Sequence, residues 1–159
     1  MILKAARTPR AASDGRSVTF HDIVVAVDGS ADAELALTHA IDLAGHGRSR
    51  LTLFTAIAQP PPLAYWGLAA PGLLTFFELA EAEADKIARR ARDRVSEHVC
   101  VTLVVTSRRV RAALVQQIAD GQHDLVVMGG RDRSGISRYV LGHSAVPVLI
   151  VHGESFRHH

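Results

Sequence analysis

The feature of this sequence that most constrains its fold is a regular alternation between two kinds of segment. Short apolar runs of strand length alternate with longer segments in which apolar residues recur every three or four positions. This alternation is typical of a parallel sheet flanked by helices, because each parallel connection needs a crossover. The apolar runs are nearly continuous, which indicates strands buried on both faces. The predicted strands are Ile23–Val27, Leu51–Ile57, Val99–Val105, Leu125–Met128 and Val146–Val151.

Three helices are predicted between these strands. The first follows Ser30, whose hydroxyl can cap it, and ends near Gly45. The second is a long amphipathic helix over 76–95, in which charged residues fall between the apolar positions. The third covers 110–118. We therefore predict a doubly wound α/β fold, with a five-stranded parallel sheet that is flanked by helices on both faces.

Composition and charge indicate one globular domain with a basic N-terminal tail. The chain has 159 residues, of which 48% are hydrophobic, enough for one sizeable core. The formal net charge is +2, but residues 1–20 carry four basic side chains against one acidic, a balance of +3 that leaves −1 for residues 21–159. The folded part therefore has no global electrostatic reason to bind nucleic acid. We expect a flexible tail over 1–20, the domain over 21–153 and a C-terminal tail over 154–159.

The sequence favours a cytoplasmic location without a membrane span. Cys100 is the single cysteine, so no internal disulfide can form, which fits a reducing compartment. The N-terminus has no apolar stretch of signal-peptide length. The uncharged segment 51–77 is long enough to cross a bilayer, but three consecutive prolines at 60–62 interrupt it. We expect the apolar loop around Trp66 to pack on the sheet or to contact a partner.

Two turns that follow predicted strands carry residues suited to ligand binding. In an open parallel sheet, ligands bind outside the carboxyl ends of the strands, where the strand order reverses. The first turn contains Asp28, Gly29 and Ser30. The second contains Gly129 and Gly130, followed by two arginines in the next four residues. Capping of the next helix alone would also explain the first turn, and a solvated turn would also explain the second.

No pattern in the sequence indicates an enzyme. The chain lacks the phosphate-binding loop of ordinary nucleoside triphosphatases and the glycine fingerprint of dinucleotide-binding domains. None of its nine histidines has the spacing to cysteines or carboxylates that a metal site needs. No pair of carboxylates or Cys/His arrangement suits acid–base or covalent catalysis. We predict neither catalytic nor metal-binding residues.

Three segments, in the correct order, resemble landmarks of the universal stress protein family. They are Ile23–Ser30, Asp124–Gly129 and Val146–Val151. The resemblance covers nearly all of residues 21–151 and implies a cytoplasmic, non-catalytic stress-response protein. It also implies the strand order 3-2-1-4-5, which places the first and fourth strands side by side. The turns at Asp28 and Gly129 should then face each other across one crevice.

The ATP-binding pattern of that family is only partly present. ATP-binding members carry a glycine, two residues, a second glycine, nine residues, a third glycine, and then Ser or Thr. Gly129 matches the first glycine and Gly142 the third, but Asp132 replaces the second glycine and His143 the hydroxyl residue. Only three residues separate Gly142 from Val146, where the family usually has a helix whose N-terminus would attract phosphate. The resemblance therefore implies weakened or lost ATP binding.

The resemblance also supplies candidate binding residues. Asp28 matches an aspartate that contacts the nucleotide, and Ala56 falls where a small strand residue offers its backbone to adenine. Ser144 could substitute for the missing hydroxyl. The candidate residues are Asp28, Ala56, Gly129, Gly130, Gly142 and Ser144. We expect no cofactor; the alternative is a regulatory switch that binds an adenine nucleotide, namely AMP, cyclic AMP, or ATP with magnesium.

The last strand suggests a homodimer. Val146–Val151 is apolar and would form an edge of the sheet, where unpaired backbone groups invite antiparallel pairing with a second copy. Dimers of the family commonly use this strand. We therefore expect a homodimer through Val146–Val151.

Overall fold

The computed structural model describes residues 2–4, 19–45, 49–60, 70–107, 109–130 and 135–153. The helices and strands, in chain order, are β1 (Ile2–Lys4), β2 (Asp22–Ala26), α1 (Ala31–Gly45), β3 (Arg50–Ala56), α3 (Ala70–Asp93), β4 (Cys100–Thr106), α4 (Val110–Asp120), β5 (Leu125–Gly129), α5 (Ile136–His143) and β6 (Val148–Val151). Among these residues, no helix is long and apolar enough to cross a membrane.

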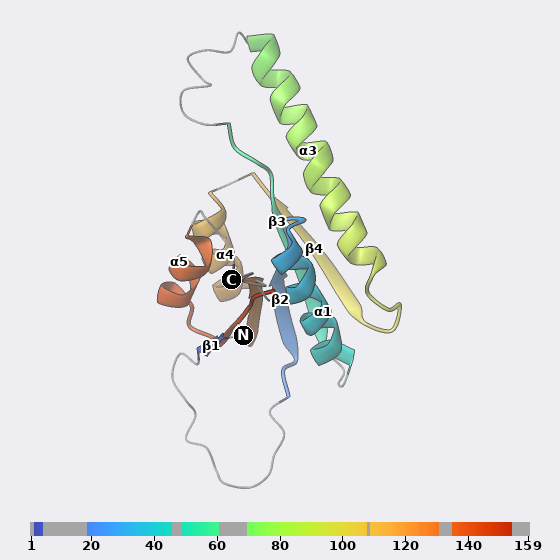
Figure 1. Cartoon of the computed structure of the whole chain (residues 1–159), viewed down its shortest axis with the longest axis vertical. Helices are drawn as coiled ribbons and strands as arrows, with labels where there is room; N and C mark the ends of the chain where they lie inside the picture. Colours follow the sequence, from blue (N-terminus) through green and yellow to red (C-terminus); the bar gives the residue numbers. More distant parts are fainter. Residues whose placement is uncertain are drawn as a thin grey trace, which may run out of the picture.

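The strands form a single sheet in the order β1-β6-β5-β2-β3-β4 (Figure 1). All neighbouring pairs are parallel except β1 with β6. Without β1, this order is the predicted 3-2-1-4-5, and the α/β fold is confirmed. Each predicted strand is present to within two residues at either end. The last begins at Val148 rather than Val146, and the intervening Pro147 has no N–H to donate to a sheet.

Helices cover both faces of the sheet, and each face has its own apolar cluster. On one face, α1 and the end of α3 pack against Ile23, Val25 and Leu51. On the other face, α4 and α5 pack against Val24 and Val126. The central strands β2 and β5 are therefore buried on both sides. This double burial explains why their sequences are continuous apolar runs rather than alternating ones.

The predicted tail contains a strand. Residues 2–4 form β1, which pairs with β6 in the register Ile2↔Ile150 and Lys4↔Val148. A flexible tail over the whole of 1–20 is therefore wrong for residues 2–4. The expected open edge at the last strand is also wrong, because β1 satisfies backbone groups that would otherwise be free to pair with another chain. The other predicted tail residues, 1, 5–18 and 154–159, and the loop around Trp66 lie outside the described residues.

A helix not expected from the sequence, α5, lies between β5 and β6. It ends at His143, and its C-cap is Ser144. The chain then turns directly into β6, so no helix follows Gly142, as the spacing to Val146 predicted. The helix of this connection instead contains Gly142 in its last turn.

Polar contacts join the amino ends of the central strands. The Asp124 carboxylate accepts hydrogen bonds from the backbone N–H groups of His21 (2.7 Å) and Asp22 (3.0 Å). The Asp22 carboxylate in turn forms an ion pair with Arg50 and lies 3.0 Å from Nδ1 of the buried His123. These contacts connect the start of β2 to the starts of β3 and β5, at the amino ends of the parallel strands.

We predict that Asp124→Ala lowers the free energy of unfolding by about 1–3 kcal/mol, because two partly desolvated N–H groups lose an ionised acceptor. Urea unfolding at neutral pH measures the change. Asp120→Ala is the matched control, since this exposed carboxylate accepts hydrogen bonds from Gln116 within α4. Its effect should stay within about 0.5 kcal/mol. Equal losses in the two variants would contradict a special role for Asp124.

Candidate functional site

A cavity of about 500 Å³ opens at the carboxyl ends of β2, β3 and β5. It lies where the strand order reverses, because the helices that follow β2 and β5 pack on opposite faces of the sheet. Its size is in the range of small-molecule sites. The lining residues are Ala26, Val27, Asp28, Ser30, Asp32, Ala33, Phe54, Thr55, Ala56, Val110, Leu114, Met128, Gly129 and Ile136.

The turn between β2 and α1 forms one wall of the cavity. Asp28 Oδ1 accepts a hydrogen bond from the backbone N–H of Ser30 (2.8 Å), and Ser30 Oγ accepts one from that of Ala33 (3.2 Å). Gly29 has a φ of +78°, a conformation that favours glycine. Helix capping by Ser30 is thus present, and Asp28 both orders the turn and lines the cavity.

The part of the lining at the end of β5 requires glycine at position 129. A Cβ on Gly129 would lie 2.8 Å from the backbone N of Ala33 and the backbone C of Asp32. The end of β5 therefore touches the first turn of α1 directly. This close approach closes one side of the cavity and leaves no room for a larger residue.

The cavity is mostly apolar, and its charged groups are acidic. Phe54, Leu114 and Met128 provide a surface suited to a flat apolar ring. Asp28 and Asp32 are its two carboxylates, and no basic side chain is among the described lining residues. A carboxylate accepts hydrogen bonds from hydroxyl groups but repels phosphate. The lining is therefore better suited to a nucleoside than to a triphosphate.

Asp32 also has a structural role. It is buried, and its Oδ1 accepts a hydrogen bond from the backbone N–H of Gly153 (3.1 Å). This contact fastens the chain after β6 to the first turn of α1. The free N–H groups of that turn stabilise a negative charge at this position.

The structure brings together three of the six predicted site residues. Asp28, Ala56 and Gly129 line the cavity. Gly130 lies just beyond its lining, where its N–H donates to the carbonyl of Val151 and a Cβ would collide with His152.

The other two predicted residues lie elsewhere. Gly142 is in the last turn of α5, outside the lining. Ser144 Oγ donates to the carbonyl of Val146 (2.8 Å) and accepts from its N–H (3.2 Å), so this hydroxyl is used within its own turn. The arginines at 131 and 133 and Asp132 lie outside the described residues.

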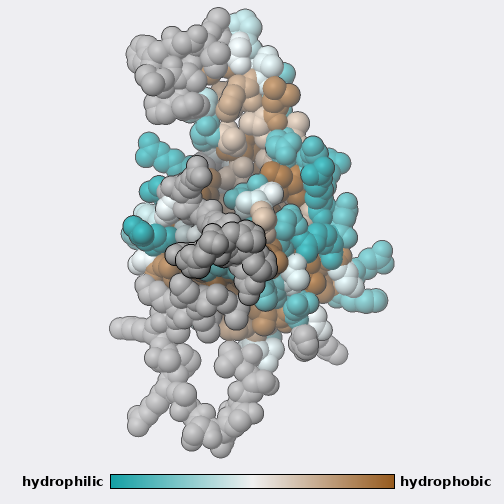
Figure 2. Space-filling model, in the orientation of Figure 1, coloured by the Kyte–Doolittle hydropathy of each residue, from teal (hydrophilic) through white to brown (hydrophobic). Residues whose placement is uncertain are grey.

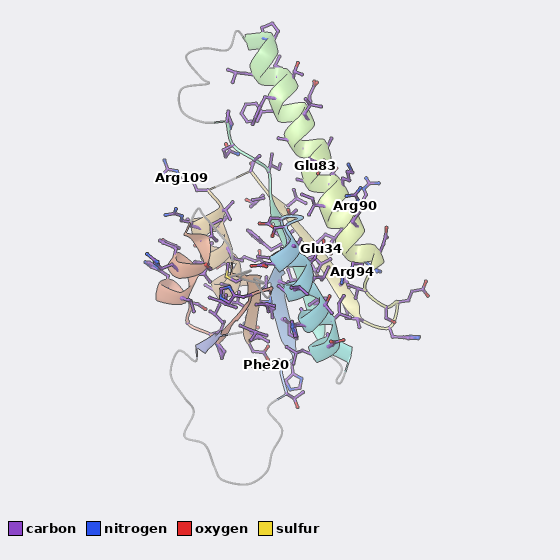
Figure 3. The ribbon with its side chains drawn as sticks, in the orientation of Figure 1. Phe20, Glu34, Glu83, Arg90, Arg94 and Arg109 are labelled. Atoms are coloured by element: carbon purple, nitrogen blue, oxygen red, sulfur yellow. The ribbon has the colours of Figure 1, made fainter. Side chains whose placement is uncertain are left out.

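A second cavity of about 510 Å³ adjoins the first and carries positive charge. The two share Val110 and Ile136, which begin α4 and α5. Arg109 and Arg111 line the second cavity, and Arg109 is labelled at the start of α4 in Figure 3. Two helix N-termini and two arginines therefore lie next to the acidic cavity. Such a place suits a single phosphate group.

Thr55 and these arginines are candidate site residues that were not predicted from the sequence. Thr55 is 2% exposed, lines the cavity, and its Oγ1 has no hydrogen-bond partner within the described part of the chain. An unsatisfied buried hydroxyl is costly. The available signal was a hydroxyl residue next to Ala56 in a strand that is mainly apolar. In the described ranges, no group of three or more His, Cys, Asp or Glu residues could hold a metal ion.

The fold and the placement of the cavity define a doubly wound α/β protein with a ligand crevice at the point where the strand order reverses. The family model for universal stress proteins matches residues 19–152. The chain belongs to the universal stress protein family.

A curated universal stress protein from Mycolicibacterium smegmatis is 27% identical over 151 residues, which cover 87% of this chain and 50% of that protein. The chain therefore spans about half the length of this relative. The function of the whole relative is therefore not assigned to this chain.

Solved structures of the same family share the fold. A universal stress protein from Lactobacillus plantarum matches with a TM-score of 0.68 at 20% identity, covering 85% of this chain and 99% of that one. An Arabidopsis thaliana family member with AMP bound matches with 0.66 at 12% identity, covering 85% and 93%. A universal stress protein in complex with cAMP matches with 0.61 at 24% identity, covering 86% and 100%.

Two glycine substitutions test how this site is built. We predict that Gly129→Ala lowers the free energy of unfolding by about 1–3 kcal/mol, because its Cβ meets the backbone of α1. Gly142→Ala should instead raise it by about 0.5–1 kcal/mol, because nothing lies within 4 Å of the new Cβ and alanine favours the helix. Thermal and urea unfolding measure both changes. If Gly142→Ala lowered the free energy of unfolding as much as Gly129→Ala, the close contact of Gly129 with α1 would not explain the result.

Proposed function

We propose that this protein is a non-catalytic, cytoplasmic stress-response module that binds an adenine nucleoside monophosphate and has weakened ATP binding. The observation that carries the proposal is the convergence of Asp28, Ala56 and Gly129 around one mainly apolar cavity. The adenine would lie against the apolar lining, and Asp28 would accept a hydrogen bond from a ribose hydroxyl. The location is supported by a single cysteine, Cys100, which is free.

Charge favours one phosphate over three. Asp28 and Asp32 repel a triphosphate inside the cavity, and Gly142 and Ser144 do not reach it. A single phosphate could instead point towards Arg109 and Arg111 in the adjoining cavity. Family structures with AMP, cAMP and dAMP bound are consistent with a monophosphate ligand. Magnesium would be needed only for ATP.

The alternative is an interaction module that has lost nucleotide binding altogether. The placement of Gly142 and Ser144 away from the cavity favours it, because two of the expected phosphate contacts are absent from the lining. Both readings describe a protein without enzymatic activity, so they differ only in whether the cavity is occupied.

Thermal unfolding of the nucleotide-stripped protein distinguishes the nucleotide-binding proposal from the alternative without nucleotide binding. We predict that millimolar AMP or cyclic AMP raises the melting temperature by several degrees, because a ligand at 100 times its Kd stabilises the fold by about 2.7 kcal/mol. ATP with magnesium should have a smaller effect. Asp28→Ala should abolish the shift relative to its own ligand-free form, while Asp120→Ala should retain it. No shift with any nucleotide would establish the alternative.

The phosphate position has its own test. We predict that Arg109→Ala combined with Arg111→Ala weakens AMP binding roughly tenfold but leaves adenosine binding unchanged, because only AMP has a phosphate for these side chains. Isothermal titration calorimetry with the two ligands measures the difference. Arg90→Ala, an exposed arginine on α3, is the control and should alter neither affinity. Equal losses for AMP and adenosine would contradict this placement of the phosphate.

A further inference from the structure

The second cavity is larger than a phosphate group requires. Its volume of about 510 Å³ is close to the 500 Å³ of the first cavity. A phosphate group is only a few times the size of a water molecule, whose share of liquid volume is about 30 Å³. In the proposed function the phosphate lies beside Arg109 and Arg111, and it would leave most of this cavity unfilled. The remaining space suits a small organic group.

The lining of the second cavity combines aliphatic, aromatic and cationic side chains. Its described residues are Arg109, Val110, Arg111, Ala112, Ile136 and Tyr139, and none of them is acidic. Figure 3 labels Arg109 at the start of α4, and Figure 2 shows hydrophilic surface there. An aromatic ring packs well against tyrosine, and the face of such a ring attracts a guanidinium group. This lining therefore suits a flat ring.

The aromatic member of this lining is already held in position. The ring of Tyr139 stacks on the ring of His143, with centroids 4.0 Å apart and an angle of 18° between the planes. His143 Nδ1 also lies 2.8 Å from the carbonyl oxygen of Tyr139, one turn earlier in α5. A preorganised ring costs a ligand less ordering entropy than a mobile one. A ligand ring that packs on Tyr139 would extend an existing stack.

The boundary between the two cavities is formed by the starts of α4 and α5. Val110 and Ile136 line both cavities and are the first residues of these helices. The N-caps before them, Arg109 and Gly135, make no side-chain capping hydrogen bond. A Cβ on Gly135 would lie 3.9 Å from Nη2 of Arg111, so this guanidinium lies near the start of α5. A phosphate at this boundary would have a cavity on either side of it.

We propose that the ligand of this site is a diester of AMP, in which the phosphate carries a second group with a flat aromatic ring. This inference rests on the proposed function, which places the adenine in the first cavity and the phosphate beside Arg109. The second ring then occupies the second cavity against Tyr139. Aryl esters of AMP and dinucleoside monophosphates share this chemistry, and in the latter the second ring is a nucleobase.

The ring, rather than the charge of the phosphate, would decide the preference for a diester. A phosphate monoester carries a charge of about −1.5 to −2 at pH 7, whereas a diester has a single negative charge. The smaller charge reduces the repulsion by Asp28 and Asp32 and also the attraction to Arg109 and Arg111. Burial of the ring against the apolar lining is then the net gain. The methyl ester of AMP, which has the same charge but no ring, isolates this gain.

Isothermal titration calorimetry with esters of AMP tests the proposal. We predict that the phenyl ester binds about tenfold more tightly than the methyl ester, because its ring is buried in the second cavity. The dinucleoside monophosphate of adenosine identifies the kind of ring. A similar or larger gain with this ligand assigns the second ring to a nucleobase, and a gain with the phenyl ester alone assigns it to a smaller aryl group.

Filling the second cavity should remove this preference. Ala112 is an exposed residue of α4 that lines the cavity, so Ala112→Trp places an indole where the ring of the ligand would lie. The phenyl and methyl esters should then bind equally, while adenosine binding stays unchanged and reports a folded first cavity. Ala119→Trp is the matched control, because Ala119 is exposed on the same helix and lies outside both described linings. It should retain the preference.

The results separate this inference from the proposed function. If neither the phenyl ester nor the dinucleoside monophosphate bound more tightly than the methyl ester, the inference would be overturned, whereas binding of AMP would still support the proposed function. If neither AMP nor any ester bound, both would be overturned. A preference for the phenyl ester that survived Ala112→Trp would place the ring outside the second cavity and would also overturn the inference.

Discussion

The parallel pairing of β2 with β5 is the contact on which the rest of the structure depends. These strands are buried on both faces, between the cluster under α1 and α3 and the cluster under α4 and α5. Because the helices that follow them leave to opposite faces, their carboxyl ends cannot both be covered by one helix. An opening at this place is a consequence of the topology, and the cavity occupies it. The topology therefore creates a place for a ligand whichever residues line it.

The residues around this opening serve the fold and the site at the same time. Asp28 orders the turn before α1, and Gly129 allows β5 to touch that helix, yet both also line the cavity. Acidic groups near a helix N-terminus stabilise the helix, but they make the same place unfavourable for several phosphates. This conflict is relieved if the phosphate lies at the starts of α4 and α5, beside Arg109. In the proposed function, the same charges would set both the stability of α1 and the ligand preference of the cavity.

The strands and their order could be predicted from the sequence, because double burial leaves long apolar runs and the family resemblance orders them. The elements that were missed are short. β1 is three residues long and is stabilised by β6, almost 150 positions away. The eight residues of α5 begin after Gly135 and end near Gly142, which obscures a helical pattern. Asp28, Ala56 and Gly129 were predicted by resemblance, and Thr55 could have been found as the hydroxyl residue next to Ala56. Arg109 meets the site only through the arrangement of strands and helices, which no local pattern records.

The two edges of the sheet differ in how their backbone groups are paired. Three residues of β1 are enough to occupy the outer side of β6, so the edge that looked most open from the sequence is paired within the chain. The edge at β4 pairs with β3 alone among the described strands, and α3 contacts both of these strands. The cavity lies at the carboxyl ends of β2, β3 and β5, and none of its lining residues comes from β4 or α3. The candidate site is therefore built on the central strands, and neither edge strand of the described sheet contributes a lining residue to it.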